Sequence, residues 1–378
     1  MSTGNPTVFR TLNERTALTL LLEHGALTRA ELETHTGLSK ASAAEVLRRL
    51  ENSGLARKAG HKPGNAGPAA QMWALDGSAA RVAGVDLTTR SIEVSVADLT
   101  GRVLGGHRTE ATGDARLLLE ETLAAAGFRL DELDQVVVGV PGIVEAEGRR
   151  LRQAVQLAGW TGLDDLPGHV RLENDVNLVA IREQQEHQDD SFVLFWVGAG
   201  VGAGAVLDGT VWRGVTGRGG EVGSVIVPDP VSKGRVYGHD GGPLGALLGA
   251  EPLAALAAAH GVTAEPTLDG AGRALREADP RFLSDVAARV ALGVSAAIGV
   301  LDPGLVVLAG PLCIAGGEPL RALVAGRLAE TPLVPVTVAL SAVDGNAVLD
   351  GALCYALDLT RERVFQAGTA GRTGESHP

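Results

Sequence analysis

Apolar residues recur at helical spacing in three short stretches near the start of the chain. The first predicted helix runs from Thr11 to Glu23, and its apolar residues are Leu12, Ala17, Leu18, Leu21 and Leu22. Thr28 and Glu31 have the spacing of a capping box, which predicts a second helix from Arg29 to His35. Ser39 and Gly54 predict the two ends of a third helix, from Lys40 to about Asn52. This order of helices predicts a helix-turn-helix.

The segment from Leu55 to Leu75 predicts two strands around a tip rich in Gly and Pro. The tip has the sequence Gly60-His61-Lys62-Pro63-Gly64-Asn65-Ala66-Gly67-Pro68, and Arg57 and Lys58 stand at its base. A basic hairpin after a helix-turn-helix is typical of a wing that lies against the DNA backbone or minor groove. We therefore expect residues 1–78 to form a winged helix-turn-helix DNA-binding domain.

In this arrangement the third helix lies in the major groove and presents its first turn to the bases. Leu38, Val46, Leu47 and Leu50 are expected to face the core, whereas Ser39, Lys40, Ser42 and Ala43 are expected to face outward. The candidate DNA contacts are Thr28, Arg29, Ser39, Lys40, Ala41, Ser42, Arg48, Arg49, Arg57, Lys58 and Lys62. The same helices could form a module that binds a protein partner, but the capped third helix and the basic tip favour DNA.

Charge is divided unevenly along the chain, whose formal net charge is −12. Residues 1–81 contain ten Lys and Arg against seven Asp and Glu, and the remainder contains 23 against 38. An acidic body repels a phosphate polymer, so a nucleic-acid contact is expected only in the first part. A charge imbalance of this size can also arise by chance, so the prediction of DNA binding depends on the pattern of helices.

The rest of the chain alternates strand and helix patterns. Val82 to Asp98 predicts two strands around a turn at Thr88-Thr89, and Phe192 to Val211 repeats this plan around a Gly-rich turn. Helical patterns follow at 115–126, 252–260 and 282–300. Such alternation predicts an α/β body of two related lobes over residues 79–365, with the lobe boundary near 180–190 and a cleft between the lobes. The small polar residues 366–378 are expected to be an unstructured tail.

The Gly-rich run at 200–205 satisfies the dinucleotide-binding pattern G-x-G-x-x-G/A. A dinucleotide site requires a helix after the glycines, because the amino end of that helix holds the pyrophosphate. Here Ala205 to Val211 predicts a strand and a turn, so the match is interpreted as a β-hairpin.

Composition narrows the class of protein. The chain has 378 residues, of which 45% are hydrophobic and 21% charged, values typical of globular domains. Its two cysteines, Cys313 and Cys354, are too far apart for a disulfide framework or a Cys-based zinc cluster, and they favour a reducing cytoplasm. No signal peptide and no membrane-spanning run is expected, so a membrane is not a predicted partner.

Five short blocks give this chain a resemblance to the ROK family (repressors, open reading frames and kinases), in particular to its repressor branch. The blocks are Gly84-Val85-Asp86-Leu87, Val138-Gly139-Val140-Pro141-Gly142, Glu173-Asn174-Asp175-Val176-Asn177, Gly219-Gly220-Glu221-Val222-Gly223 and Val306-Val307-Leu308-Ala309-Gly310. The resemblance extends from about Arg10 to Leu357. It implies a multidomain α+β protein, in which a winged helix-turn-helix precedes an actin-like, sugar-kinase-type body with duplicated ribonuclease H-like halves.

The resemblance also implies a ligand site. In the sugar kinases of the family, the position of Asp175 is the base that acts on the sugar hydroxyl, and the positions of Asn174 and Glu221 bind sugar hydroxyls. Ser224 stands where the kinases have a His that helps to bind sugar and zinc. Without the resemblance, Asn174 and Asp175 could equally cap a loop, and Glu221 could lie in a surface turn.

The departures from the kinase pattern concern the phosphate loops and the zinc segment. Asp86 is followed by Leu87-Thr88-Thr89-Arg90 instead of a Gly-Gly-Thr stretch, and Gly198-Ala199-Gly200 lacks the usual hydroxyl. The Cys-rich segment is replaced by Val236 to Gly245, in which His239 and Asp240 alone make no tetrahedral site. We expect no zinc, no ATP and no catalytic residue, with Asp175 as a vestigial base. The wing also lacks the family's Arg before Pro68, so Arg57, Lys58 and Lys62 would carry its DNA contacts.

The sequence therefore predicts a cytoplasmic transcriptional regulator, most simply a repressor, that binds a double-stranded DNA operator as a homodimer or homotetramer. Its body would sense a sugar or sugar derivative, or set the oligomeric state. Two alternatives stay open. One is an ATP-dependent sugar kinase with an appended DNA-binding head, and the other is a ligand-free dimerisation scaffold.

Overall fold

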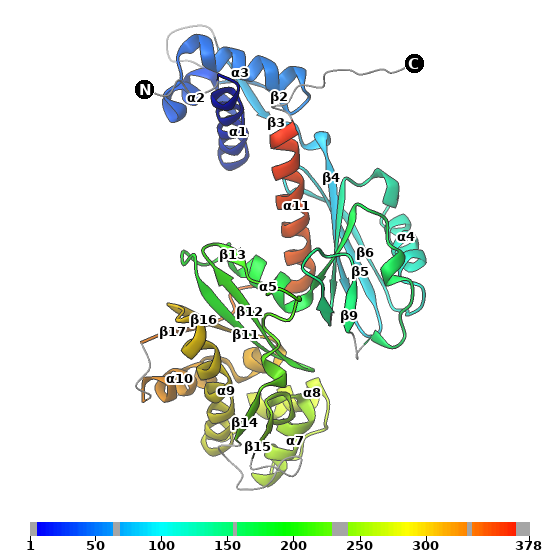
Figure 1. Ribbon diagram of the computed structural model, residues 1–378, viewed down its shortest axis with the longest axis vertical. Helices are drawn as coiled ribbons and strands as arrows, with labels where there is room; N and C mark the ends of the chain where they lie inside the picture. The colour runs from blue at the N-terminus through cyan, green and yellow to red at the C-terminus, as the bar shows by residue number, and fades with distance from the viewer. Residues whose placement is uncertain (1–5, 63–68, 154–156, 229–240, 331–334, 368–378) are drawn as a thin grey trace. The chain divides into compact units, whose positions relative to one another are not determined.

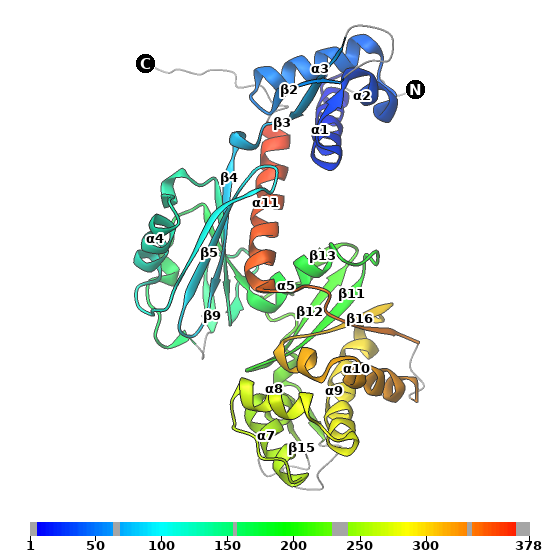
Figure 2. The same ribbon diagram turned by 180° about the vertical axis from the view of Figure 1, so that it is seen from behind.

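The computed structural model describes residues 6–62, 69–153, 157–228, 241–330 and 335–367, which form two compact units (Figures 1 and 2). The first unit comprises the described residues within Met1–Val138, Gly159–Arg171 and Ala352–Pro378, and the second those within Gly139–Ala158 and Leu172–Gly351. The chain thus crosses between the two units at several points, whereas the pattern of elements predicted one lobe boundary near 180–190. The reason is that residues 159–171 and the described residues after 351 return to the first unit.

Three helices and a small sheet form the head of the first unit. The helices are α1 (Pro6–His24), α2 (Arg29–Thr36) and α3 (Lys40–Asn52). Strands β2 (Ala56–Lys62) and β3 (Ala70–Leu75) confirm the predicted wing hairpin, whose tip residues 63–68 lie outside the described ranges. A short strand that the sequence did not predict, β1 (Leu27–Thr28), extends the order to β1-β3-β2. Leu12, one of the apolar residues of the first predicted helix, is 57% exposed.

A five-stranded sheet follows the head in the same unit. Its order is β10-β7-β4-β5-β6, with the bounds β4 Arg81–Leu87, β5 Ile92–Asp98, β6 Val103–Thr109, β7 Gln135–Val140 and β10 Val170–Asn174. Helices α4 (Ala115–Ala125) and α11 (Ala347–Ala367) lie on opposite sides of this sheet in Figure 1. The short elements η1 Gly77–Ala79, η2 Leu130–Glu132 and η4 Leu163–Asp165 also belong to the first unit, whereas the strand pair β8 Ile143–Val144 and β9 Leu151–Gln153 belongs to the second.

The second unit is built on a sheet of order β13-β12-β11-β16-β17, with bounds Thr210–Val211, Val201–Leu207, Phe192–Val197, Leu305–Ala309 and Thr337–Leu340. Both sheets therefore place three consecutive strands and then two later ones in the same order, which confirms the prediction of two related lobes. The helices are α5 Asp175–Glu183, α6 Gly245–Leu248, α7 Ala250–Ala259, α8 Leu268–Arg276, α9 Pro280–Leu301 and α10 Pro311–Ala329. A hairpin of β14 (Ile226–Pro228) and β15 (Gly241–Pro243) and the turn η5 (Val222–Ser224) complete the described elements.

The Gly-rich run serves helix packing in this unit. Gly198 to Gly200 turns β11 into β12, with Val197 opposite Val201 in an antiparallel hairpin. Helix α5 crosses the following glycines closely, because a Cβ on Gly204 would lie 2.8 Å from the Cβ of Ala180. No helix follows these glycines, so the hairpin interpretation is confirmed, and the glycines are needed for close packing of α5 on β12.

Helix α9 is long and apolar enough to cross a membrane by length and composition, which the sequence analysis did not expect of any segment. Its residues Phe282, Val290 and Val294 are buried in the core of the second unit together with Phe195 of β11. Such burial is typical of the central helix of a folded domain. The two cysteines are free, in agreement with the expected lack of a disulfide framework.

The core of the head includes residues from distant parts of the chain. Leu99, after β5, and Phe365, near the end of α11, are buried in one hydrophobic cluster with Leu18, Leu47 and Leu50 of the head. In both views of the ribbon, the end of α11 lies beside the wing strands (Figures 1 and 2). The head therefore does not have a hydrophobic core of its own, because part of that core comes from the last helix.

Candidate functional site

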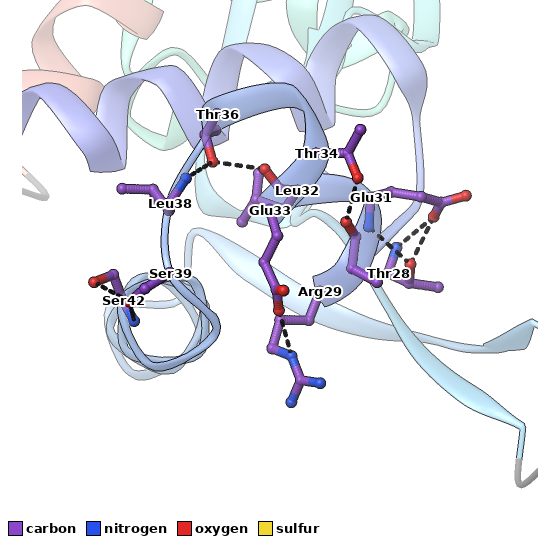
Figure 3. Close-up of polar contacts among 11 residues, drawn as sticks. Thr28, Arg29, Glu31, Leu32, Glu33, Thr34, Thr36, Leu38, Ser39 and Ser42 are labelled. Carbon is purple, nitrogen blue, oxygen red and sulfur yellow. Dashed lines mark hydrogen bonds and ion pairs between the residues drawn. The ribbon is translucent and has the colours of Figure 1, made fainter.

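Local hydrogen bonds fix the ends of α2 and α3 (Figure 3). The hydroxyl of Thr28 accepts from the backbone N–H of Glu31 at 3.3 Å, and the Glu31 carboxylate accepts from the backbone N–H of Thr28 at 2.8 Å. The hydroxyl of Ser39 accepts from the N–H of Ser42 at 3.2 Å, and Gly37 ends α2 in the left-handed conformation with φ 69°. The predicted capping box, the N-cap of α3 and the turn between the helices are therefore confirmed.

The amino-terminal turn of α3 is an exposed polar face. Ser39, Lys40, Ala41 and Ser42 are all exposed, as a helix that enters a major groove requires. Ala43, which was expected to face outward, is completely buried. The expectation was wrong because Ala43 lies three and four residues before Val46 and Leu47, and this spacing places it on their face of the helix.

Most of the basic side chains predicted to contact DNA form ion pairs within the head. The exposed or half-exposed pairs are Arg29–Glu33 at 2.8 Å, Arg48–Glu45 at 2.6 Å, Lys58–Glu51 at 3.0 Å and Lys62–Glu31 at 2.5 Å. Surface pairs of this kind contribute about 1 kcal/mol or less, so a phosphate can replace the carboxylate. In the described part of the chain, Lys40 and Arg57 have no carboxylate at ion-pair distance, and both are exposed.

The carboxylate of Glu31 connects the wing to α2. Lys62 of β2 lies 2.5 Å from it, while the backbone and hydroxyl of Thr28 also donate to it. These contacts, with Lys62 the strongest, lower the pKa of Glu31 to about 2. Thr28 itself is buried at 5% exposure, so its side chain is occupied by the cap.

The second unit brings together part of the predicted ligand site around the start of α5. Asn174 caps this helix: its Oδ1 accepts from the N–H of Asn177 at 3.1 Å, and its Nδ2 donates to the carbonyl of Gly142 at 3.0 Å. Asp175 is half-buried in the first turn, and its Oδ1 accepts from the N–H of Val176 at 2.9 Å. Asn174 thus has the capping role that was the alternative to ligand binding. Its bond to Gly142 also connects the block at 173–177 to the block at 138–142.

Glu221 and Ser224 lie on a loop pressed against β12. Gly220 has φ 95°, and a Cβ there would lie 1.9 Å from the carbonyl oxygen of Ala203, so only Gly fits. Burial raises the pKa of the Glu221 carboxyl, and nearby Arg218 opposes this shift. Ser224 is exposed and its hydroxyl donates to the carbonyl of Glu221 at 2.8 Å.

The turn at Thr88 is closed by its own side chains. The Thr88 hydroxyl accepts from the N–H groups of Arg90 at 3.3 Å and Ser91 at 3.1 Å, and the Thr88 N–H donates to the carbonyl of Ser91 at 2.9 Å. Trp160 also donates to the Thr88 carbonyl at 2.8 Å. Asp86 is buried before this turn and Thr89 is exposed. In the other unit, Ala199 is exposed at the tip of its hairpin.

A sequence model described as the ROK family matches residues 82–358, which include both sheets and the blocks around Asn174 and Glu221. The chain belongs to the ROK family. A solved ROK transcriptional regulator, a homologue of the Escherichia coli Mlc protein, has a TM-score of 0.71 at 19% identity and covers 96% of this chain and 100% of its own. The match to that regulator includes the head, so the chain has the fold predicted for the repressor branch.

Two further proteins resemble parts of the chain. The ROK hexokinase of Thermus thermophilus has a TM-score of 0.59 at 23% identity, covering 75% of this chain and 99% of its own. The DNA-binding transcriptional dual regulator NagC of Escherichia coli strain K12 is 23% identical over 242 residues, or 59% of each chain. The ROK body thus shares its fold with sugar kinases.

Two residues beside the candidate ligand residues were not singled out from the sequence. Glu173 precedes Asn174 and is buried, and Arg213 lies 2.7 Å from its carboxylate. The position of Glu173 inside the Glu-Asn-Asp block was a signal for it, whereas nothing in the sequence marked Arg213. His239 and Asp240, for which no zinc site was expected, lie outside the described residues, as do Gly67 and Pro68 of the wing.

Proposed function

We propose that this ROK protein is a DNA-binding transcriptional repressor of the cytoplasm whose sugar-kinase-like body senses a sugar instead of phosphorylating it. The observation that carries the proposal is the exposed first turn of α3, with Lys40 at its start and the basic strand β2 nearby. Helix α3 would read bases in the major groove, and Arg57, Lys58 and Lys62 would meet the backbone. NagC and the Mlc homologue are described as transcriptional regulators, which supports this assignment.

The proposed absence of kinase activity rests on the Thr88 turn. A phosphate loop presents backbone N–H groups to the nucleotide, but the N–H groups of Thr88, Arg90 and Ser91 are already bonded within the turn. Their release for a phosphate would cost the hydrogen bonds of the turn. We accordingly do not propose ATP as a cofactor, and we propose no zinc because the Cys-rich segment of the kinases is replaced in this sequence.

The proposed ligand is a sugar or sugar derivative, held by Asn174, Asp175 and Glu221. The amide of Asn174 and the two carboxylates provide the donors and acceptors that bind paired hydroxyls. In the proposed mechanism, the ligand binds one arrangement of the two units better than the other and so shifts their populations and the position of the head. A dimer would place two heads on a two-fold symmetric operator.

The decisive experiment is footprinting of the full chain on the DNA upstream of its own coding sequence, with and without a panel of sugars. A protected, roughly palindromic site whose occupancy changes with one sugar is the expected result. Protection of no DNA at any salt concentration would contradict the repressor assignment.

The second candidate function is an ATP-dependent sugar kinase with a DNA-binding head, which the presence of Asp175 and Glu221 favours. A coupled assay with ATP and a panel of hexoses tests it, and turnover that is lost on Asp175→Asn would establish it. The third candidate, a ligand-free dimerisation scaffold, predicts that no sugar or sugar phosphate raises the melting temperature.

A further inference from the structure

Glu173 is the buried neighbour of the two residues that begin α5. It stands in β10 directly before Asn174 and Asp175, and its side chain is 3% exposed. A carboxylate removed from water destabilises a fold unless it is paired and hydrogen-bonded. A charge at this position therefore requires a specific set of donors.

Three donors surround the carboxylate. Arg213 Nε donates to Oε2 at 2.7 Å, while the side-chain amide of Asn177 and the backbone N–H of Asn174 donate to Oε1 at 3.0 and 3.1 Å. The last of these bonds holds the backbone of Asn174, which is itself a candidate ligand-binding residue. The Glu173 carboxylate therefore sets the conformation at the start of α5.

Arg213 belongs to the other ligand block. Its guanidinium also donates to the carbonyl of Val211 at 3.2 Å, and its own carbonyl accepts from the N–H of Gly219 at 2.9 Å. The approach at Gly219 is close, because a Cβ there would lie 2.8 Å from the carbonyl carbon of Arg213. Gly219 is two residues before Glu221, so Arg213 holds the base of the Glu221 loop.

We infer that Arg213 is a positioning residue that joins the two halves of the ligand site. Its side chain holds Glu173 beside Asn174 and Asp175, and its backbone holds the loop that carries Glu221. The pair fixes the spacing between these hydroxyl-binding groups before ligand arrives, which lowers the ordering cost of binding. The inference rests on the proposed sugar-sensing function.

The first arm of the test needs no ligand. Hydrogen exchange of the full chain is compared between the wild type, Arg213→Met and the control Arg273→Met, which removes an exposed pair with Glu265 in the same unit. We expect Arg213→Met to speed exchange at least tenfold at both residues 174–177 and 219–222, with β16 unchanged. A change confined to only one of the two segments, 174–177 or 219–222, or one spread evenly over the unit, would overturn the coupling.

The second arm measures sugar binding by thermal shift with D-glucose, D-xylose and N-acetyl-D-glucosamine. We expect Arg213→Met and Glu173→Gln each to raise the Kd of a bound sugar at least tenfold. The double variant leaves no buried charge unpaired, so its melting temperature should recover while its sugar affinity does not. Recovery of both would mean that Arg213 only stabilises the fold.

The two arms separate failure of the inference from failure of the proposed function. If no sugar shifts the wild type, sugar sensing is contradicted for this panel, and the exchange arm still decides whether Arg213 couples the two blocks. If the wild type binds a sugar and Arg213→Met binds it equally well, the positioning role is overturned.

Discussion

The guanidinium of Arg49 in α3 lies 2.6 Å from the carboxylate of Glu14 in α1, and the Glu14 side chain is only 3% exposed. Arg49, whose side chain is 30% exposed, therefore links α3 to α1. Its neighbour Arg48 has a side chain that is 59% exposed and pairs with Glu45 on the same helix. Two adjacent arginines, both expected at phosphates, thus have different surroundings.

Arg49→Ala should destabilise the head, because it removes the guanidinium that faces a buried carboxylate. We expect a loss of about 2 kcal/mol in the opening free energy of α1 and α3, measured by hydrogen exchange. The matched control Arg48→Ala removes a solvent-exposed pair and should leave this opening free energy almost unchanged. Equal losses in the two variants would contradict the structural role of Arg49.

Lys40→Ala should reduce sequence discrimination. Lys40 is exposed in the first turn of α3, where side chains reach base edges, so its loss should weaken operator binding more than random-duplex binding. Arg48→Ala should weaken both alike, because a phosphate contact carries no sequence information. Fluorescence anisotropy with the two duplexes at fixed salt measures this. If both substitutions act equally on both duplexes, α3 is not the element that reads the sequence.

Phe365→Ala should loosen the head although the residue is near the end of the chain. Phe365 is 7% exposed within the core of the head, and truncation of a buried Phe costs about 3 kcal/mol or more. Hydrogen exchange in α1 to α3 should therefore accelerate. Glu362→Ala, at an exposed position of the same helix, is the control. Unchanged exchange in the head would show that its core is complete without α11.

Glu221→Gln should stabilise the unliganded protein while it weakens sugar binding. Burial raises the folded-state pKa of Glu221 above its usual value of 4.5, so the fold favours the protonated form. Its contribution to stability is therefore present below the unfolded pKa and is lost as pH rises through the folded pKa. The neutral amide removes this loss.

We expect the melting temperature of Glu221→Gln to exceed that of the wild type at pH 7 and the difference to disappear near pH 4. Thermal melting across this range measures it. A variant that melts below the wild type at pH 7 would mean that the Glu221 carboxylate has stabilising partners in the fold.

The elements of the head were predictable because their signals are local. The Thr28–Glu31 box, the Ser39 cap and the Gly37 turn are hydrogen bonds or backbone conformations within four residues, so the sequence specified α2 and α3 to within a residue. The strand β1 has only two residues and forms by pairing with distant β3. No local pattern could indicate it.

The candidate site divides in the same way. Asn174, Asp175 and Glu221 were named through family blocks, and the structure places Asn174 and Asp175 at the start of α5. Arg213 was not foreseen, because its importance comes from a buried partner forty residues earlier in the chain. Distance along the sequence gives no information about that pairing.

By itself, the sequence determined the order of helices and strands, the winged head and the two α/β lobes, because periodicity and capping act over a few residues. Only the tertiary structure decided which charged groups are buried, as with Glu14, and which segments complete a core, as with Phe365. Burial and ion pairing depend on which remote segments pack together, and this information belongs to the folded chain as a whole.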